Sequence, residues 1–176
     1  MSVDRKVNVI EDLEGKKTVV IHDIIFKGRR HIDWKDVEKY LKKYVGEFYE
    51  IEDSNEIVYI GNDLPDEYAH SNSSISLQGL NAKAKANAAQ GLPEIVKTAS
   101  KTNHIQNRKE KHAKDAFYGW YSYDSKFALP VFNSEAEIER YNVFHAALIV
   151  RHAEDGKKYL YDIVNIKKET SNLFQP

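Results

Sequence analysis

Apolar and polar positions along the first sixty residues predict a short β-α-β-β segment. Residues 17–26 (KTVVIHDIIF) are β-branched and apolar, which is typical of a strand. A helix is expected over roughly 34–45, where Asp33 is a suitable N-cap and Gly46 a suitable C-terminal stop. Residues 47–52 and 56–60 then predict two strands. The apolar face of the helix follows i, i+3, i+4, i+7 and i+8 spacing through Val37, Tyr40, Leu41, Tyr44 and Val45.

The amino-acid composition of the middle of the chain changes twice, from loop-forming to helix-forming and then to very polar. Residues 61–78 are rich in Gly, Asn, Asp, Pro and Ser, and they predict a loop or linker and a domain boundary. Residues 80–90 (LNAKAKANAAQ) have very high helix propensity, and a second helix is expected from Pro93 to about Ser100. A third, very polar helix is expected over roughly 103–117.

The last third of the chain predicts β-structure. Residues 120–132 place aromatic and aliphatic residues around a polar centre, which indicates one bent strand or a hairpin. Two further strand-like runs, 140–153 and 157–169, flank Asp155-Gly156, and Asp-Gly between such runs is typical of a hairpin turn. The pattern therefore predicts an α+β protein with a small acidic segment over 1–70 and a helix-plus-sheet domain over 79–176.

The length of the hairpin loop decides which side chains face each other. A two-residue loop places Arg151 opposite Leu160 and diagonal to Asp162, and it places His152 opposite Tyr159. A three-residue loop with a bulge shifts this register by one.

Composition narrows the class of protein. The 176 residues include no cysteine, so disulfide and thiolate chemistry are excluded. The N-terminus has no signal-peptide core, and no apolar run approaches the roughly 20 residues of a membrane helix, so we expect a soluble, cytoplasmic protein without membrane contact. Residues 1–70 hold 11 Lys/Arg against 16 Asp/Glu, whereas residues 81–126 hold 9 against 4. The basic middle is either a nucleic-acid footprint or an ordinary solvated helix face.

The absence of two motifs excludes kinases, Rossmann-type dinucleotide-binding enzymes and α/β-hydrolases. The chain contains no nucleotide-binding glycine loop and no G-x-S-x-G elbow. In the predicted polar helix, His104, Arg108 and His112 follow i, i+4, i+8 spacing, which places them on one side. Metal-binding histidines on a helix need i, i+4 spacing, and no carboxylate cluster is evident, so we expect no metal.

Histidine beside basic residues without a metal suits RNA cleavage by the RNA's own 2′-hydroxyl. Histidine serves as acid or base near neutral pH, and a guanidinium stabilises the charge on phosphorus. Arg151 is a candidate for that guanidinium, although a cross-strand ion pair with Asp162 explains it equally simply. His145 shares its strand face and is typical of a half-buried surface residue. Aromatic residues that could stack on unpaired bases are Trp120, Tyr121 and Tyr123.

Five stretches in combination resemble a nuclease-like family carried by phages and integrative elements. The family is named for likeness to barnase, EndoU, colicin E5/D and RelE nucleases and is associated with polyvalent proteins. The matching stretches are LNAKAKANAAQG (80–91), NRKEKHAKDAFYGWYSY (107–123), KFALPVF (126–132), RYNVF (140–144) and IVRHAEDGKKYLYDIVNIKKET (149–170).

The resemblance implies helices packed on a C-terminal four-stranded antiparallel sheet, and metal-independent, cofactor-free RNA cleavage. By analogy, His112 would be the base or acid, Arg151 would hold the phosphate, and Thr170 would donate a hydrogen bond to it. The residues expected to bind nucleic acid are Arg108, Lys111, Tyr121 and His152.

Two functions of different classes follow from the sequence. The first is a toxin-like, metal-independent ribonuclease of a phage or mobile element. The alternative is a catalytically inactive accessory or inhibitor protein that binds a host protein or a nucleic acid, with the acidic N-terminal segment as the protein-docking surface.

Overall fold

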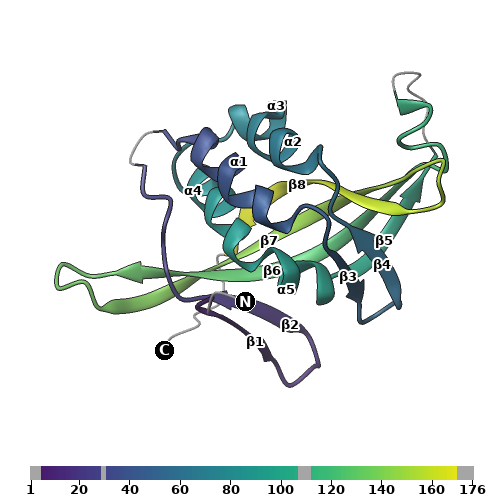
Figure 1. Cartoon of the computed structure of the whole chain (residues 1–176). Coiled ribbons are helices and arrows are strands. Elements are labelled where there is room, and N and C mark those ends of the chain that lie inside the picture. Colours follow the sequence, from purple (N-terminus) through teal and green to yellow (C-terminus); the bar gives the residue numbers. More distant parts are fainter. Residues whose placement is uncertain (1–4, 29–30, 107–111, 170–176) are drawn as a thin grey trace.

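The computed structural model describes residues 5–28, 31–106 and 112–169. Its centre is one mixed sheet in the order β1-β2-β6-β7-β8-β4-β3, with β5 paired to β6 beside this path. The sheet curls into a half-barrel, and helices α1 to α4 lie together on one side of the long strands (Figure 1). Strands from both predicted segments share this sheet, and residues from both share one hydrophobic core.

Three long strands form the middle of the sheet. They are β6 (Trp120–Phe132), β7 (Ile138–His152) and β8 (Lys158–Lys168), and each pairs antiparallel with the next along the chain. Residues 120–132 form a single strand, which is one of the two forms that the sequence allowed. The fully buried pair Phe127 and Phe144 stacks across β6 and β7, with ring centroids 5.5 Å apart.

Two N-terminal hairpins flank this meander. One consists of β1 (Val7–Glu11) and β2 (Lys17–Ile21), the other of β3 (Phe48–Ile51) and β4 (Glu56–Tyr59). Each joins the meander through a parallel pairing, β2 with β6 and β4 with β8. The expectation of a four-stranded antiparallel sheet with helices packed on it is therefore wrong. The N-terminal strands do not form a separate layer because their apolar faces complete the same core.

Short helices connect and fill the half-barrel. Asp33 caps α1 (Trp34–Leu41), as predicted, and the 3-10 turn η1 (Lys42–Tyr44) continues it. Residues 61–78 are not a linker, because they form α2 (Leu64–His70) and α3 (Asn72–Ile75). The polar composition concealed these helices, whose buried residues include Leu64 and Tyr68.

Helix α4 (Gly79–Ala88) lies in the interior, followed by the 3-10 turn η2 (Ala89–Gly91) and by α5 (Leu92–Lys97). Its small alanine side chains let it approach the sheet closely, and its contacts include β8 and β6. The helix also carries one buried cation, Lys85, whose ammonium lies 2.7 Å from a carboxylate oxygen of Asp162 in β8. The predicted cross-strand pair of Asp162 with Arg151 is therefore replaced by a pair with a helix.

The polar stretch after α5 is a strand rather than the start of a helix. Strand β5 (Ser100–Ile105) pairs antiparallel with the first part of β6. The predicted helix over 103–117 is wrong, since the chain is extended at its beginning and forms turns over residues 113–118. An edge strand with solvent on one side can be as polar as a surface helix, so composition did not distinguish them.

Candidate functional site

The turn between β7 and β8 sets the register of the predicted site. The Ala153 amide donates to the Lys157 carbonyl and the Gly156 amide to the Ala153 carbonyl, both at 2.9 Å, so the loop has three residues. Gly156 has φ +85°, which a glycine adopts without strain. Arg151 consequently lies opposite Tyr159, and His152 opposite Lys158. The two-residue register is wrong by one position, because the turn adopts the bulged form.

Arg151 is held by neighbouring protein groups. Its Nε and Nη2 donate to the two carboxylate oxygens of Asp63, both at 3.3 Å, and its Nη1 donates to the Asp115 carbonyl at 3.0 Å. The guanidinium lies 4.3 Å from the centroid of the Tyr159 ring. The residue is only 9% exposed. The carboxylate of Asp63 and the carbonyl of Asp115 therefore compensate the positive charge of Arg151.

His112 lies next to Arg151, on the segment that packs against the β7–β8 hairpin. Its Nδ1 is 2.9 Å from a carboxylate oxygen of Asp115, the residue whose carbonyl accepts from Arg151. The imidazole packs edge-on against Trp120 and Tyr161, at centroid distances of 5.1 and 5.8 Å, and its side chain is 12% exposed. The structure therefore brings His112 and Arg151 together through Asp115, and it fixes the orientation of the imidazole.

Backbone hydrogen bonds hold this segment on the hairpin. The Tyr118 amide donates to the His152 carbonyl, and the His152 amide donates to the Gly119 carbonyl, both at 2.9 Å. The Glu154 amide donates to the Lys114 carbonyl at 2.8 Å. The turns over residues 113–118 are thus attached to the end of β7 and to the β7–β8 loop by backbone hydrogen bonds.

A second group of residues, which we call the β5 surface, contains the predicted Tyr121 and His152. The His104 ring stacks on Tyr121 with centroids 4.5 Å apart, and Lys101 and Lys158 place their ammonium groups 4.5 and 4.3 Å from the Tyr121 centroid. Cations and imidazole thus surround one aromatic ring. The members of the β5 surface are Lys101, His104, Phe117, Tyr118, Tyr121, His152 and Lys158.

Two aromatic side chains of the β5 surface are open to solvent. Phe117 is 55% exposed and Tyr118 is 49% exposed, and their rings meet edge-to-face at 4.9 Å. Tyr118 also lies 4.9 Å from the His152 ring, and its carbonyl accepts from His104 Nε2 at 2.9 Å. Of the aromatic residues expected to stack on bases, Tyr123 is fully buried and Trp120 packs against His112.

Glu56 lies under the β5 surface and compensates part of its charge. Its carboxylate forms a hydrogen-bonded ion pair with Lys158 and lies 3.5 Å from Lys101. Burial disfavours the charged carboxylate, but the bond from Lys158 and the charges of both lysines outweigh burial and hold the pKa of Glu56 below its usual value. Glu56 therefore stays anionic and fixes both lysine stems in place.

His152 is held as a neutral imidazole. Burial lowers its pKa below 6.5, which outweighs the hydrogen bond to the Gly156 carbonyl. That carbonyl can only accept, so Nε2 carries the proton at 3.2 Å, and Nδ1 accepts from the Tyr121 hydroxyl at 3.4 Å. His152 thus contributes an aromatic face rather than a positive charge at neutral pH.

Three of the predicted site residues, Arg108, Lys111 and Thr170, lie outside the described residues. The last described residue, Glu169, donates its amide to the Val143 carbonyl at 2.7 Å. Val143 is eight residues from Arg151 along β7, and eight residues of strand span roughly 26 Å. The described end of β8 is therefore at the opposite end of the sheet from the Arg151 guanidinium.

Sequence reasoning missed the two carboxylates of this region. Asp63 lies immediately before α2, in the stretch taken for a linker, and Asp115 follows His112 by three residues. The i, i+3 spacing of His112 and Asp115 was visible in the sequence and was the available signal. No local signal pointed to Asp63, because it reaches Arg151 across 88 residues.

A possible metal-ligand group also appears in the described residues. One ligand atom each of Glu38, Asp66 and His70 lies within 4.8 Å of the others, on α1 and α2. His70 Nε2 is 2.8 Å from Glu38. The expectation of a metal-free protein stays a prediction.

Comparison with protein-family models, curated proteins and solved structures found no match for this chain. The nuclease-family resemblance is therefore still a prediction. None of the helices in the described part of the chain has the length and apolar character needed to cross a membrane.

Proposed function

We propose that this chain is a cytoplasmic RNA-binding domain that takes single-stranded RNA on the β5 surface. The observation that carries the proposal is the exposed aromatic pair Phe117 and Tyr118, which the His152 ring connects to Tyr121 and its two lysines. Exposed rings next to lysines provide what a single strand needs, which is a face for an unstacked base and a charge for its phosphate.

The surrounding sequence supports this choice of ligand. The stretch 107–111 (NRKEK) contains three cations and one carboxylate and precedes His112 directly. The whole chain has a net charge of −1, so attraction to a polyanion depends on this local concentration of cations. A duplex hides its bases, whereas a single strand offers each base for stacking.

Substitution of the two exposed rings tests the proposal. We expect Phe117→Ala and Tyr118→Ala each to weaken binding of a fluorescein-labelled 12-nucleotide single-stranded RNA by roughly 5- to 150-fold, because stacking contributes about 1–3 kcal/mol per base. Fluorescence anisotropy at fixed ionic strength measures the Kd.

The matched control is Phe48→Ala, which removes a 60% exposed phenylalanine of β3 that is not a member of the β5 surface. We expect it to leave the affinity unchanged. No binding by the unaltered chain, or equal losses in the Phe117 and Phe48 variants, would refute the β5 surface as the RNA site.

The His112–Asp115 pair favours a second function, metal-independent RNA cleavage. A carboxylate 2.9 Å from Nδ1 orients the imidazole, as in enzymes where histidine removes a proton from a hydroxyl. His112 would then take the proton of the RNA 2′-hydroxyl as that oxygen attacks the adjacent phosphorus. The P–O5′ bond breaks, which leaves a 2′,3′-cyclic phosphate, and water protonates the departing 5′-oxygen. The engagement of Arg151 by Asp63 weighs against a phosphate role for that guanidinium.

Cleavage of total tRNA in the presence of EDTA tests this second function. We expect the unaltered chain to cleave and His112→Gln to lose activity by roughly 10²- to 10⁴-fold, the usual contribution of a general base. Gel analysis with 5′-labelled tRNA gives the rate, and Tyr118→Ala serves as a control that affects binding alone. Absence of cleavage by the unaltered chain removes the enzymatic function and leaves the binding function untouched.

A further inference from the structure

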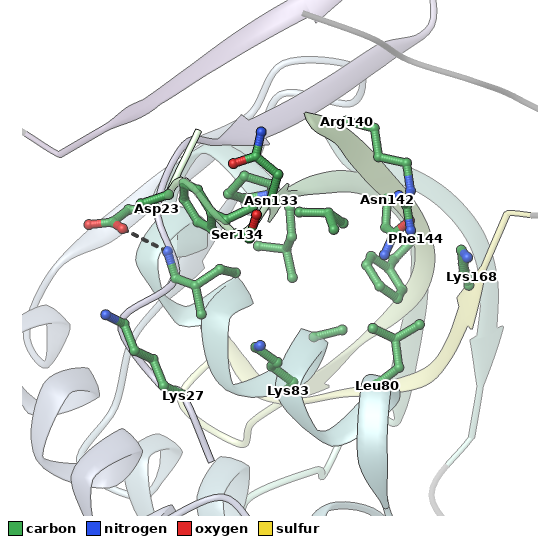
Figure 2. A pocket seen from close by; sticks show the side chains of 17 residues that line it. Asp23, Lys27, Leu80, Lys83, Asn133, Ser134, Arg140, Asn142, Phe144 and Lys168 are labelled. Carbon is green, nitrogen blue, oxygen red and sulfur yellow. Dashed lines mark hydrogen bonds between the residues drawn. The ribbon is translucent and has the colours of Figure 1, made fainter. Parts of the chain in front are cut away.

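A cavity in the described part of the chain lies at the opposite end of β6 and β7 from the β5 surface. Its volume is about 830 Å³. The α4 side chains Lys83 and Leu80 line it on one side, and Asn133 and Ser134 of the β6–β7 turn line it on the other (Figure 2). Asp23 and Lys27, from the segment after β2, and Lys168, at the end of β8, complete the ring of labelled side chains.

Every second residue in the first half of β7 contributes to one wall of the cavity. Arg140, Asn142 and Phe144 alternate with residues of the other face, so their side chains share one side of the strand. Their exposure decreases along the strand: Arg140 is partly exposed, Asn142 is 9% exposed and Phe144 is fully buried. The opposite wall follows helical spacing, with Leu80, Lys83 and Ala84 at i, i+3 and i+4 on α4.

The lining of the cavity is strongly cationic. Four of its side chains are basic, and Asp23 is its one acidic residue; the basic residues are Lys27, Lys83, Arg140 and Lys168. Arg140 pairs with its sequence neighbour Glu139 at 3.2 Å, where both side chains are about half exposed. The three lysines form no ion pair with any residue that the structure describes. Lysines distributed around the rim of one cavity, with a single acidic residue among the lining, make the local potential positive and attract an anion.

Asn142 adds a second, independent indication of a ligand. The residue is 9% exposed and lines the cavity, and its amide atoms are not among the fully buried side-chain atoms that lack a hydrogen bond. No hydrogen bond joins this amide to another described residue, so the amide is open to the cavity. There it offers a donor and an acceptor to a bound molecule.

We propose that this cavity binds a small organic phosphate of nucleotide size. The lysines hold the phosphate, Asn142 forms hydrogen bonds to polar atoms of the organic part, and the apolar lining from Leu80 and Leu129 covers its flat face. A volume of about 830 Å³ falls in the range of small-molecule sites, which favour an apolar lining with a few polar groups. This site is separate from the β5 surface and does not depend on the RNA-binding proposal.

Isothermal titration calorimetry of the full chain tests the proposal. The probes are the four ribonucleoside 5′-monophosphates, the corresponding nucleosides and inorganic phosphate. We expect at least one monophosphate to bind at least tenfold more tightly than its nucleoside and than inorganic phosphate, since only the monophosphate uses both the lysines and the amide. Absence of binding by all four monophosphates overturns the proposal.

Variants locate the site. We expect Lys83→Gln combined with Lys168→Gln, and separately Asn142→Ala, to weaken the monophosphate at least tenfold. The matched control Lys35→Gln removes an exposed lysine of α1 outside the cavity and should leave the Kd unchanged. Thermal melting shows that each variant is folded, and shifts in a ¹H–¹⁵N spectrum of the unaltered chain report binding without any substitution.

The results also distinguish a free phosphate ester from nucleic acid. Affinity for the single-stranded 12-mer should be equal in the Lys83/Lys168 double variant and in the unaltered chain. If the 12-mer loses affinity in that variant while the monophosphates do not bind, the cavity holds a nucleic-acid backbone and the small-molecule proposal is wrong.

Discussion

Replacement of Lys85 by methionine is expected to lower the free energy of unfolding by about 3–5 kcal/mol, because it leaves a buried carboxylate without its cation. The Lys85 side chain is fully buried, and its ammonium lies 2.7 Å from Asp162. Asp162 also accepts from the Ser71 hydroxyl at 2.9 Å, and these two bonds join α4, β8 and the start of α3. Urea unfolding followed by circular dichroism measures the change.

The same variant should have a distinctive pH dependence. Burial raises the pKa of Asp162 above 3.8, and burial lowers the pKa of Lys85 below 10.5, although each partner opposes this for the other. Without Lys85, the pKa of Asp162 rises further, so the folded variant binds a proton at a pH where the unfolded chain does not. Acidification through that window then favours the folded state. The deficit of Lys85→Met should therefore be largest at neutral pH and should shrink as the pH falls toward the usual range of a carboxyl group.

A double variant provides the control. Lys85→Met with Asp162→Asn removes both charges, and the asparagine oxygen can still accept from Ser71. We expect the double variant to be more stable than Lys85→Met alone, with an unfolding free energy that does not vary with pH through Asp162. A double variant less stable than either single variant would show that the ion pair is not the source of the effect.

Arg151→Met is expected to cost roughly 2 kcal/mol of stability, in line with the loss of hydrogen bonds from a charged, mostly buried group and of its packing. The lost contacts are those to Asp63, to the Asp115 carbonyl and to the Tyr159 ring. Asp63 itself remains partly exposed and can be hydrated, which limits the cost. Chemical unfolding with the matched variant Arg140→Met measures it.

The control removes an arginine whose ion pair lies at the surface, so its effect should stay within about 0.5 kcal/mol. An Arg151→Met protein as stable as the unaltered chain, or more stable, would contradict a structural role. That outcome would return Arg151 to the candidates for phosphate binding, since residues kept for a ligand often do not contribute to stability.

Local patterns predicted those elements whose burial follows a clear period. The helix predicted over roughly 34–45 and the strands predicted over 47–52 and 56–60 formed as expected, because each has one apolar face. The strand predicted over 17–26 ends at Ile21, and strand β1 was not predicted. Helix α2 was missed because Leu64 and Tyr68 stand among polar residues, and their burial comes from packing against α1 and β8. The parallel pairings of β2 with β6 and of β4 with β8 have no local signal, since each depends on strands about a hundred residues apart.

The candidate site was predictable only in part for the same reason. Placing a basic helix against the last hairpin predicted a pocket shared by His112 and Arg151; the helix is wrong, and the structure links the two residues through Asp115, which contacts both. Their charge partners did not follow, because Asp63 comes from a different part of the chain and Asp115 acts through its backbone as well as its carboxylate. The half-barrel cavity combines α4, β7 and the segment after β2, and no single stretch of sequence contains its pattern.

The two parallel strand pairings, β2 with β6 and β4 with β8, also influence the order in which this protein folds. The β6–β7–β8 meander closes through turns between neighbours, so it can form early. The β2–β6 seam joins residues 108 apart, as in Val19 with Phe127, and the β4–β8 seam joins residues 100 apart, as in Val58 with Lys158. Such distant pairings carry a large loop-closure entropy, so the two N-terminal hairpins should dock last. Until they do, the outer edges of β6 and β8 are unprotected, and this is the stage at which the chain is most exposed to aggregation.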